Sequence, residues 1–180
     1  FDFLAPPSII AQRTLWSMLL LLPLAALRGR IPALAAALRQ PRQLGWLATA
    51  ASLLGANWLI YVWATLNGRI IEAALGYYLT PFLNMLLGRC FFGERQNRAQ
   101  ALAITFAAFG VALRFLGIHS IPWVALTLAG TFAAYGLARK KAPLGALGGL
   151  CGETLLLAPA ALAWLVLTEP SLPAAFGHTP

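Results

Sequence analysis

Six long apolar runs divide this 180-residue chain, and basic residues collect in every second gap between them. Each run is about as long as a helix that crosses ~30 Å of hydrocarbon. The runs cover residues 8–27, 44–66, 70–92, 99–116, 121–137 and 144–167. The gaps after the first, third and fifth runs hold nine of the thirteen lysines and arginines: Arg28, Arg30, Arg39, Arg42, Arg95, Arg98, Arg139, Lys140 and Lys141. Because positive residues stay on the cytoplasmic side during insertion, this pattern predicts six spans with both chain ends outside.

The composition favours the same fold class, an all-α polytopic transmembrane bundle. Hydrophobic residues make up 60% of the chain and charged residues 10%, whereas a soluble domain carries about 25% charge. A net charge of +8 is compatible with nucleic-acid binding, which needs a basic face. Here the basic residues are divided among short gaps, so we expect anionic lipid headgroups, and no nucleic acid, as their partners.

The segments between the runs predict how the helices connect. Residues 31–40 form an amphipathic stretch that we expect to lie on the cytoplasmic membrane surface. The dipeptide Asn67-Gly68 predicts a tight turn between the second and third spans. The gap at residues 117–120 is short, so we expect the fourth and fifth spans to be neighbours. Residues 19–26 and 155–162 resemble each other with their prolines aligned, which suggests a repeat in opposite orientation.

Three charged side chains inside the predicted spans are candidates for function, because such groups are costly in lipid. Arg13 and Glu72 both lie at outer-leaflet depth, so we expect them to pair. The alternatives are that Arg13 snorkels to the interface and that Glu72 is an acid favoured at a helix start. Glu153 is too deep to reach water along its own helix. It must therefore be protonated, paired or facing an aqueous cavity.

Polar and small residues line one face of the third run at four-residue spacing: Glu72, Gly76, Thr80, Asn84 and Gly88. Side chains four apart share a helix face, and Pro81 frees carbonyl groups within this row. The row suits a solute pathway, and it suits close helix packing equally. Asn57, Tyr61 and Ala64 share a face of the second run, and Trp58 and Tyr61, near mid-span, are candidates to line a cavity.

Signals for catalysis or metal binding are weak in this sequence. His119 and His178 fall in predicted external loops, without the HExxH spacing, and the chain has no GxxxxGK[ST] phosphate loop. Cys90 and Cys151 lack metal-ligand spacing, so we interpret them as small core residues. We therefore expect no metal, no cofactor and no enzyme activity. An intramembrane enzyme stays an alternative, because a catalytic dyad could assemble in space.

One long stretch resembles the RarD-type members of the EamA drug/metabolite transporter superfamily. Residues 57–100 carry NW-x2-Y-x-WA, NGR-x2-EA-x-LGYY, P-x2-N-x-LLG and FGER. The segments QRTLWS at 12–17 and ETLLLAP at 153–159 resemble the same family's second and seventh helices. Ser8 stands where the family often has an acid, five residues before Arg13. The resemblance covers almost the whole chain, except residues 170–180.

The resemblance implies a ten-helix transporter built from two inverted five-helix repeats. This chain would correspond to helices two to seven of ten, and so to a fragment, with residues 1–120 in the first repeat and 121–180 in the second. It implies a permease of the bacterial inner membrane that moves a small organic solute by alternating access, driven by an ion or substrate gradient. The family name is tied to chloramphenicol sensitivity, which does not define a physiological substrate.

We expect the substrate pathway or gate to be formed by seven residues: Arg13, Asn57, Tyr61, Glu72, Tyr77, Asn84 and Glu153. The partners expected are a small-molecule substrate and the lipid bilayer, and a homodimer is left open. A membrane scaffold or regulator without transport activity is the other alternative, and a packed interior without a polar cavity would favour it.

Overall fold

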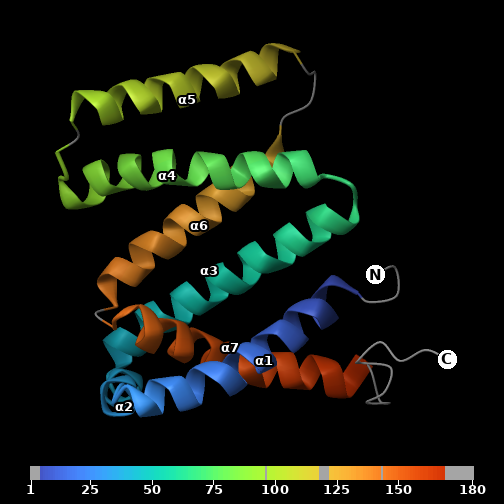
Figure 1. Ribbon diagram of the computed structural model, residues 1–180, viewed down its shortest axis with the longest axis vertical. Coiled ribbons are helices and arrows are strands. Elements are labelled where there is room, and N and C mark those ends of the chain that lie inside the picture. The colour runs from blue at the N-terminus through green and yellow to red at the C-terminus, as the bar shows by residue number, and fades with distance from the viewer. Residues whose placement is uncertain (1–4, 96, 118–121, 143, 169–180) are drawn as a thin grey trace.

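The computed structural model describes residues 5–95, 97–117, 122–142 and 144–168 as a bundle of helices (Figure 1). The fold is all-α, as the sequence predicts. Within the described residues the helices are α1 Pro6–Leu27, α2 Ile31–Arg39, α3 Pro41–Leu66, α4 Ile70–Phe92, α5 Arg98–Gly117, α6 Trp123–Lys141 and α7 Ala146–Thr168.

Proline and glycine set several of the helix ends. Each of α1, α2 and α3 has a proline in its first turn, where the missing N–H costs nothing and the fixed φ suits the helix. The turns after α1, α3 and α4 contain Gly29, Gly68 and Gly93, with φ of 62°, 71° and 65°. Glycine adopts this left-handed conformation without steric cost. The turn predicted at Asn67-Gly68 is therefore confirmed.

The helices that pack most closely are distant in sequence. α6 lies between α3 and α4 and contacts both, and α1 packs along α7 (Figure 1). α5 lies on the far side of α4 from α6 (Figure 1). The expectation that the fourth and fifth spans, now α5 and α6, are neighbours is therefore wrong. A short connection limits how far two helix ends separate, but it does not choose which faces pack.

Among the residues that the structure describes, four helices are long and apolar enough to cross a membrane by length and composition alone: α1, α3, α4 and α7. α5 and α6, with 20 and 19 residues, occupy the positions of the other two predicted spans. The helix bounds lie near the predicted ones, except that α3 begins at Pro41 and α6 continues to Lys141. The crossing of α5 and α6 stays a prediction.

Small residues allow the closest helix contacts. A Cβ atom at Gly76 of α4 would lie 2.9 Å from both the Ala125 carbonyl oxygen and the Leu128 Cβ of α6. A Cβ at Gly152 of α7 would lie 2.8 Å from Leu47 Cδ2 of α3. Glycine at such positions lets helix backbones approach each other, which is the main source of close packing in lipid.

The two proline-containing repeat segments lie on helices that pack together. Pro23 is inside α1 and Pro159 is inside α7, and Trp164 Nε1 of α7 donates a hydrogen bond to Ser8 Oγ of α1. The N-terminal part of α1 therefore lies beside the C-terminal part of α7, so the two helices are antiparallel. The amphipathic α2 buries Leu34 and packs against α3 and α7, so its apolar face contacts protein.

Candidate functional site

Arg13 lies over an aromatic ring. Its Cζ is 4.3 Å from the centroid of the Trp58 ring of α3, a distance typical of a cation–π interaction. Trp58 is 9% exposed, while Arg13 is exposed. Glu72 instead lies 3.6 Å from Arg69 on its own helix turn. The predicted ion pair between Arg13 and Glu72 is therefore wrong, because Arg69, three residues before Glu72, is the nearer cation.

Ring contacts connect α3, α4 and α6, and Trp58 lies on α3 three residues before the first of these rings, Tyr61. We call Trp58, Tyr61, Tyr77, Phe132 and Tyr135 the aromatic row. The ring centroids are 5.4 Å apart for Tyr61 and Tyr77, 6.3 Å for Tyr77 and Phe132, and 5.4 Å for Phe132 and Tyr135. Their interplanar angles of 73°, 68° and 55° include the edge-to-face geometry that aromatic pairs favour. Contacts between aromatic side chains therefore connect α3, α4 and α6.

Glu153 of α7 lies at the other end of the aromatic row. Tyr135 Oη donates a 3.0 Å hydrogen bond to Glu153 Oε2, and Arg139 Nε lies 3.3 Å from Oε1. The glutamate side chain is 0% exposed and the arginine side chain 17%. Of the three possibilities predicted for Glu153, the structure shows a paired carboxylate.

The pairing of Glu153 leaves two polar atoms unsatisfied. Among the described residues, buried Glu153 Oε1 and buried Arg139 Nη1 have no hydrogen-bond partner. The contact of Arg139 Nε with Glu153 Oε1 is therefore an ion pair without hydrogen-bond geometry. The Arg139 guanidinium lies against Gly149 of α7, where any Cβ would overlap it. The glycine-rich start of α7 therefore makes the space in which the arginine reaches the buried carboxylate.

Asn57 is buried and connects α3 to α6 by hydrogen bonds. Its Nδ2 donates to the Leu128 carbonyl oxygen at 2.9 Å and to Thr131 Oγ1 at 2.8 Å, and the residue is 0% exposed. Its Oδ1 is buried without a hydrogen-bond partner. Asn57 and Tyr61 are four residues apart and share a helix face, so Asn57 lies beside the aromatic row.

The polar face predicted on α4 serves mainly to pack the helix. Gly76, Thr80 and Gly88 are buried, and the Gly76 contact shows that α6 covers this face. Asn84 lies apart from the aromatic row, with its Oδ1 3.1 Å from where a Cβ at Gly136 would lie, and it lines a pocket of about 210 Å³ between α4 and α6. Glu72 also lies outside the row, with Arg69.

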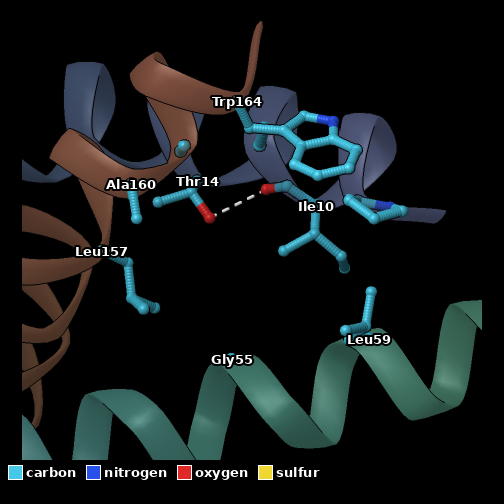
Figure 2. Close-up of a pocket in the computed structure, with 10 residues that line it drawn as sticks. Ile10, Thr14, Gly55, Leu59, Leu157, Ala160 and Trp164 are labelled. Carbon is cyan, nitrogen blue, oxygen red and sulfur yellow. Dashed lines mark hydrogen bonds between the residues drawn. The ribbon is translucent and has the colours of Figure 1, made fainter. Parts of the chain in front are cut away.

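A second pocket lies between α1, α3 and α7 (Figure 2). It has a volume of about 200 Å³ and is lined mainly by apolar groups, including Ile10, Leu59 and Leu157. The hydroxyl of Thr14 faces this region but donates to the Ile10 carbonyl oxygen of its own helix (Figure 2). The pocket therefore offers no free polar group from Thr14, and none of the seven sequence candidates lines it.

Sequence reasoning identified part of the connected site. Arg13, Tyr61, Tyr77 and Glu153 are brought into one row, whereas Glu72 and Asn84 are not. Phe132, Tyr135 and Arg139 were missed, although their three- and four-residue spacing places them on one face of α6. Arg139 was counted only as a loop charge.

The fold and the row together define a polytopic helical membrane protein in which α1, α3, α4, α6 and α7 contribute charged and aromatic side chains to one region. Residues 1–116 match the EamA-like transporter family. The chain belongs to this family.

Three curated relatives place the chain more closely. An uncharacterized transporter of Pseudomonas aeruginosa is 45% identical over 96% of this chain and 58% of its own length. Protein RarD of Escherichia coli is 37% identical over 96% of this chain and 58% of its own length. The chloramphenicol-sensitive protein RarD of Pseudomonas aeruginosa is 34% identical over 87% and 54%. The chain thus spans less than two thirds of the length of each relative. No solved structure matches it.

Proposed function

We propose that this chain provides the substrate path of a permease that moves a small organic solute across the bacterial inner membrane by alternating access. One observation carries the proposal: contacts from Arg13 to Trp58 and from Tyr61 through to Glu153 involve α1, α3, α4, α6 and α7, and Trp58 and Tyr61 are one turn apart on α3. Charged residues inside a bundle are costly, and where they persist they commonly mark a solute or proton pathway.

The depth of the two ends supports a path along the membrane normal. α1 and α7 are antiparallel, with Ser8 beside Trp164 and with Leu21 packed in the cluster that contains Cys151. The level of Glu153 is therefore near Leu21, eight residues beyond Arg13, which corresponds to ~12 Å along the helix axis at 1.5 Å per residue. We infer from the basic gaps that the Glu153 end faces the cytoplasm and both chain ends face outside.

The unsatisfied atoms of the Glu153–Arg139 pair support a role beyond packing. Buried polar groups are satisfied in most proteins, and exceptions often belong to functional sites. A pair that holds α6 to α7 without optimal hydrogen bonds can open when a solute or proton arrives. Such an opening would couple the inner end of the path to the movement of two helices.

The test measures how much radiolabelled chloramphenicol cells accumulate, because one relative is named for sensitivity to this compound. Cells that express the protein should accumulate a different amount of chloramphenicol from cells with an empty vector. This difference should depend on the external pH. Glu153→Gln should abolish the pH dependence at an equal amount of protein in the membrane. Glu94→Gln is the control, because Glu94 pairs with Lys140 at the surface, with both side chains 51% exposed.

Two results would overturn the proposal. Accumulation in Glu153→Gln cells that follows pH as in the unchanged protein would reduce Glu153 to a structural residue. Equal accumulation with and without the protein, for chloramphenicol and for the aromatic carboxylate proposed below, would favour a scaffold without transport activity.

A further inference from the structure

We propose that Arg13 and the aromatic row recognise a planar aromatic carboxylate as the transported solute. This inference rests on the proposed transport function and names its substrate class. It follows from three properties of the described residues: an arginine without an acidic partner among them, a series of aromatic rings, and tyrosine hydroxyls without a hydrogen-bond partner among them.

The charge balance of the described residues leaves Arg13 unmatched. Glu72, Glu94 and Glu153 have Arg69, Lys140 and Arg139 as their respective partners. In the part of the chain that the structure describes, no acid lies within ion-pair distance of Arg13. Its contact is the Trp58 ring. The row and its two ends therefore carry a net positive charge, which favours an anion.

A carboxylate is the anion that fits this arginine. The guanidinium group is planar and donates two parallel hydrogen bonds to a carboxylate. Arg13 is exposed, so its donors are accessible while its Cζ lies over the Trp58 ring. The negative charge of Glu153 does not cancel this attraction, because Arg139 already balances it.

The aromatic row favours a solute with a flat aromatic ring over a solute with a saturated ring. The rings of Tyr61, Tyr77 and Phe132 are within 6.3 Å of their neighbours, and Tyr77 is 40% exposed. An incoming aromatic ring gains offset or edge-to-face contacts that a saturated ring of similar size does not. Among the described residues, the hydroxyls of Tyr61 and Tyr77 have no hydrogen-bond partner, so they remain available to polar groups on the solute.

The experiment is equilibrium dialysis of the purified full-length protein against three matched ligands. Naphthalene-2-carboxylate carries the ring and the charge, naphthalene-2-carboxamide lacks the charge, and decahydronaphthalene-2-carboxylate lacks the aromatic ring. The carboxylate should bind about tenfold tighter than either analogue, as one charge-assisted hydrogen bond or one ring contact would give. Equal affinity for the carboxylate and the carboxamide would overturn the proposal.

Variants assign each preference to its residue. Arg13→Gln should lower carboxylate affinity to that of the carboxamide and leave carboxamide binding unchanged, whereas Arg13→Lys should keep part of the preference. Tyr77→Leu should remove only the preference for the aromatic ring. Arg69→Gln is the matched control, because Arg69 also lies over indole rings, those of Trp63 and Trp123, but is paired with Glu72. An equal loss for all three ligands in Arg13→Gln would show a purely structural role and overturn the proposal.

In this design, the proposal about the substrate class and the proposal about transport can each be contradicted independently of the other. If the three ligands bind in the predicted order of affinity but no tested solute is transported, the permease function is contradicted and the binding site is supported. Transport of chloramphenicol with no preference among the three ligands would keep the permease and remove the substrate class.

Discussion

The ion pair between Arg139 and Glu153 differs from the surface pairs in how completely its carboxylate is buried. Arg139→Met should leave this carboxylate without a cation in a low-dielectric setting. Removing one partner of a buried pair typically costs about 3–5 kcal/mol, so we expect a large drop in the thermal unfolding temperature of the purified protein in detergent. Adding Glu153→Gln to Arg139→Met should recover part of that loss, because the orphaned charge is then gone.

Lys140→Met provides the matched control for this pair. Lys140 is the next residue on α6, and its pair with Glu94 is 51% exposed on both sides. Exposed pairs contribute about 0–1 kcal/mol, so this variant should unfold at nearly the original temperature. Similar losses for Arg139→Met and Lys140→Met would show that the buried pair has no special role in stability.

At the level of single residues, the sequence predicted charges inside spans but not their partners. Glu153 was found because its depth alone makes it unusual. Arg139 was assigned to a loop, since the sequence does not show that its long side chain extends back along α6 into the bundle. Arg13 and Glu72 were paired by depth and sign, yet each has a nearer partner. Depth follows from position in a helix, whereas partners depend on how helices are rotated.

Between elements, the contact of α4 with α6 depends on Gly76. Gly76→Ala should push the two helices apart, because the new Cβ would meet backbone as well as side-chain atoms of α6. Overpacking of this kind costs about 1–3 kcal/mol, measurable as a lower unfolding temperature in detergent. It should also weaken the contact of Tyr77 with Phe132, and so lower the affinity for the naphthalene carboxylate.

Gly130→Ala tests the same helix pair without the clash. A Cβ at Gly130 of α6 would meet nothing within 4 Å, and alanine is favoured over glycine in a helix by up to ~1 kcal/mol. Stability should therefore stay the same or rise slightly. A loss in Gly130→Ala as large as in Gly76→Ala would contradict the assignment of Gly76 as the closest point of contact.

The extent of each helix could be predicted from the sequence, but the packing order could not. Apolar runs, prolines and glycines locate α1 to α7 to within a few residues because these signals act locally. Apolar residues cover all sides of the spanning helices, so no single face is marked for contact with a neighbour. The position of α6 between α3 and α4 therefore depends on shape, such as the space above Gly76, which a hydropathy pattern does not contain.

For the whole molecule, the alternation of basic gaps predicts which loops face the cytoplasm, and helix packing alone does not determine this. The turn after α3 contains only Arg69, whereas the gaps after the first, third and fifth apolar runs contain nine lysines and arginines. If positive residues are retained in the cytoplasm, α4 must cross the membrane, with position 67 outside and position 95 inside. The division of the chain into repeats at residues 120 and 121 rests on the family resemblance and stays a prediction.

Cysteine labelling of intact cells tests this topology. The background carries Cys90→Ala and Cys151→Ala, which remove both native thiols. A membrane-impermeant maleimide should label Asn67→Cys in intact cells but Arg95→Cys only after permeabilisation. His119→Cys, placed between α5 and α6 in the sequence, should be labelled from outside if both of these helices cross. Outside labelling at positions 67 and 95 alike would show that α4 does not span the membrane. Labelling at position 119 only after permeabilisation would leave α5 and α6 on the cytoplasmic side, and six spans would become four.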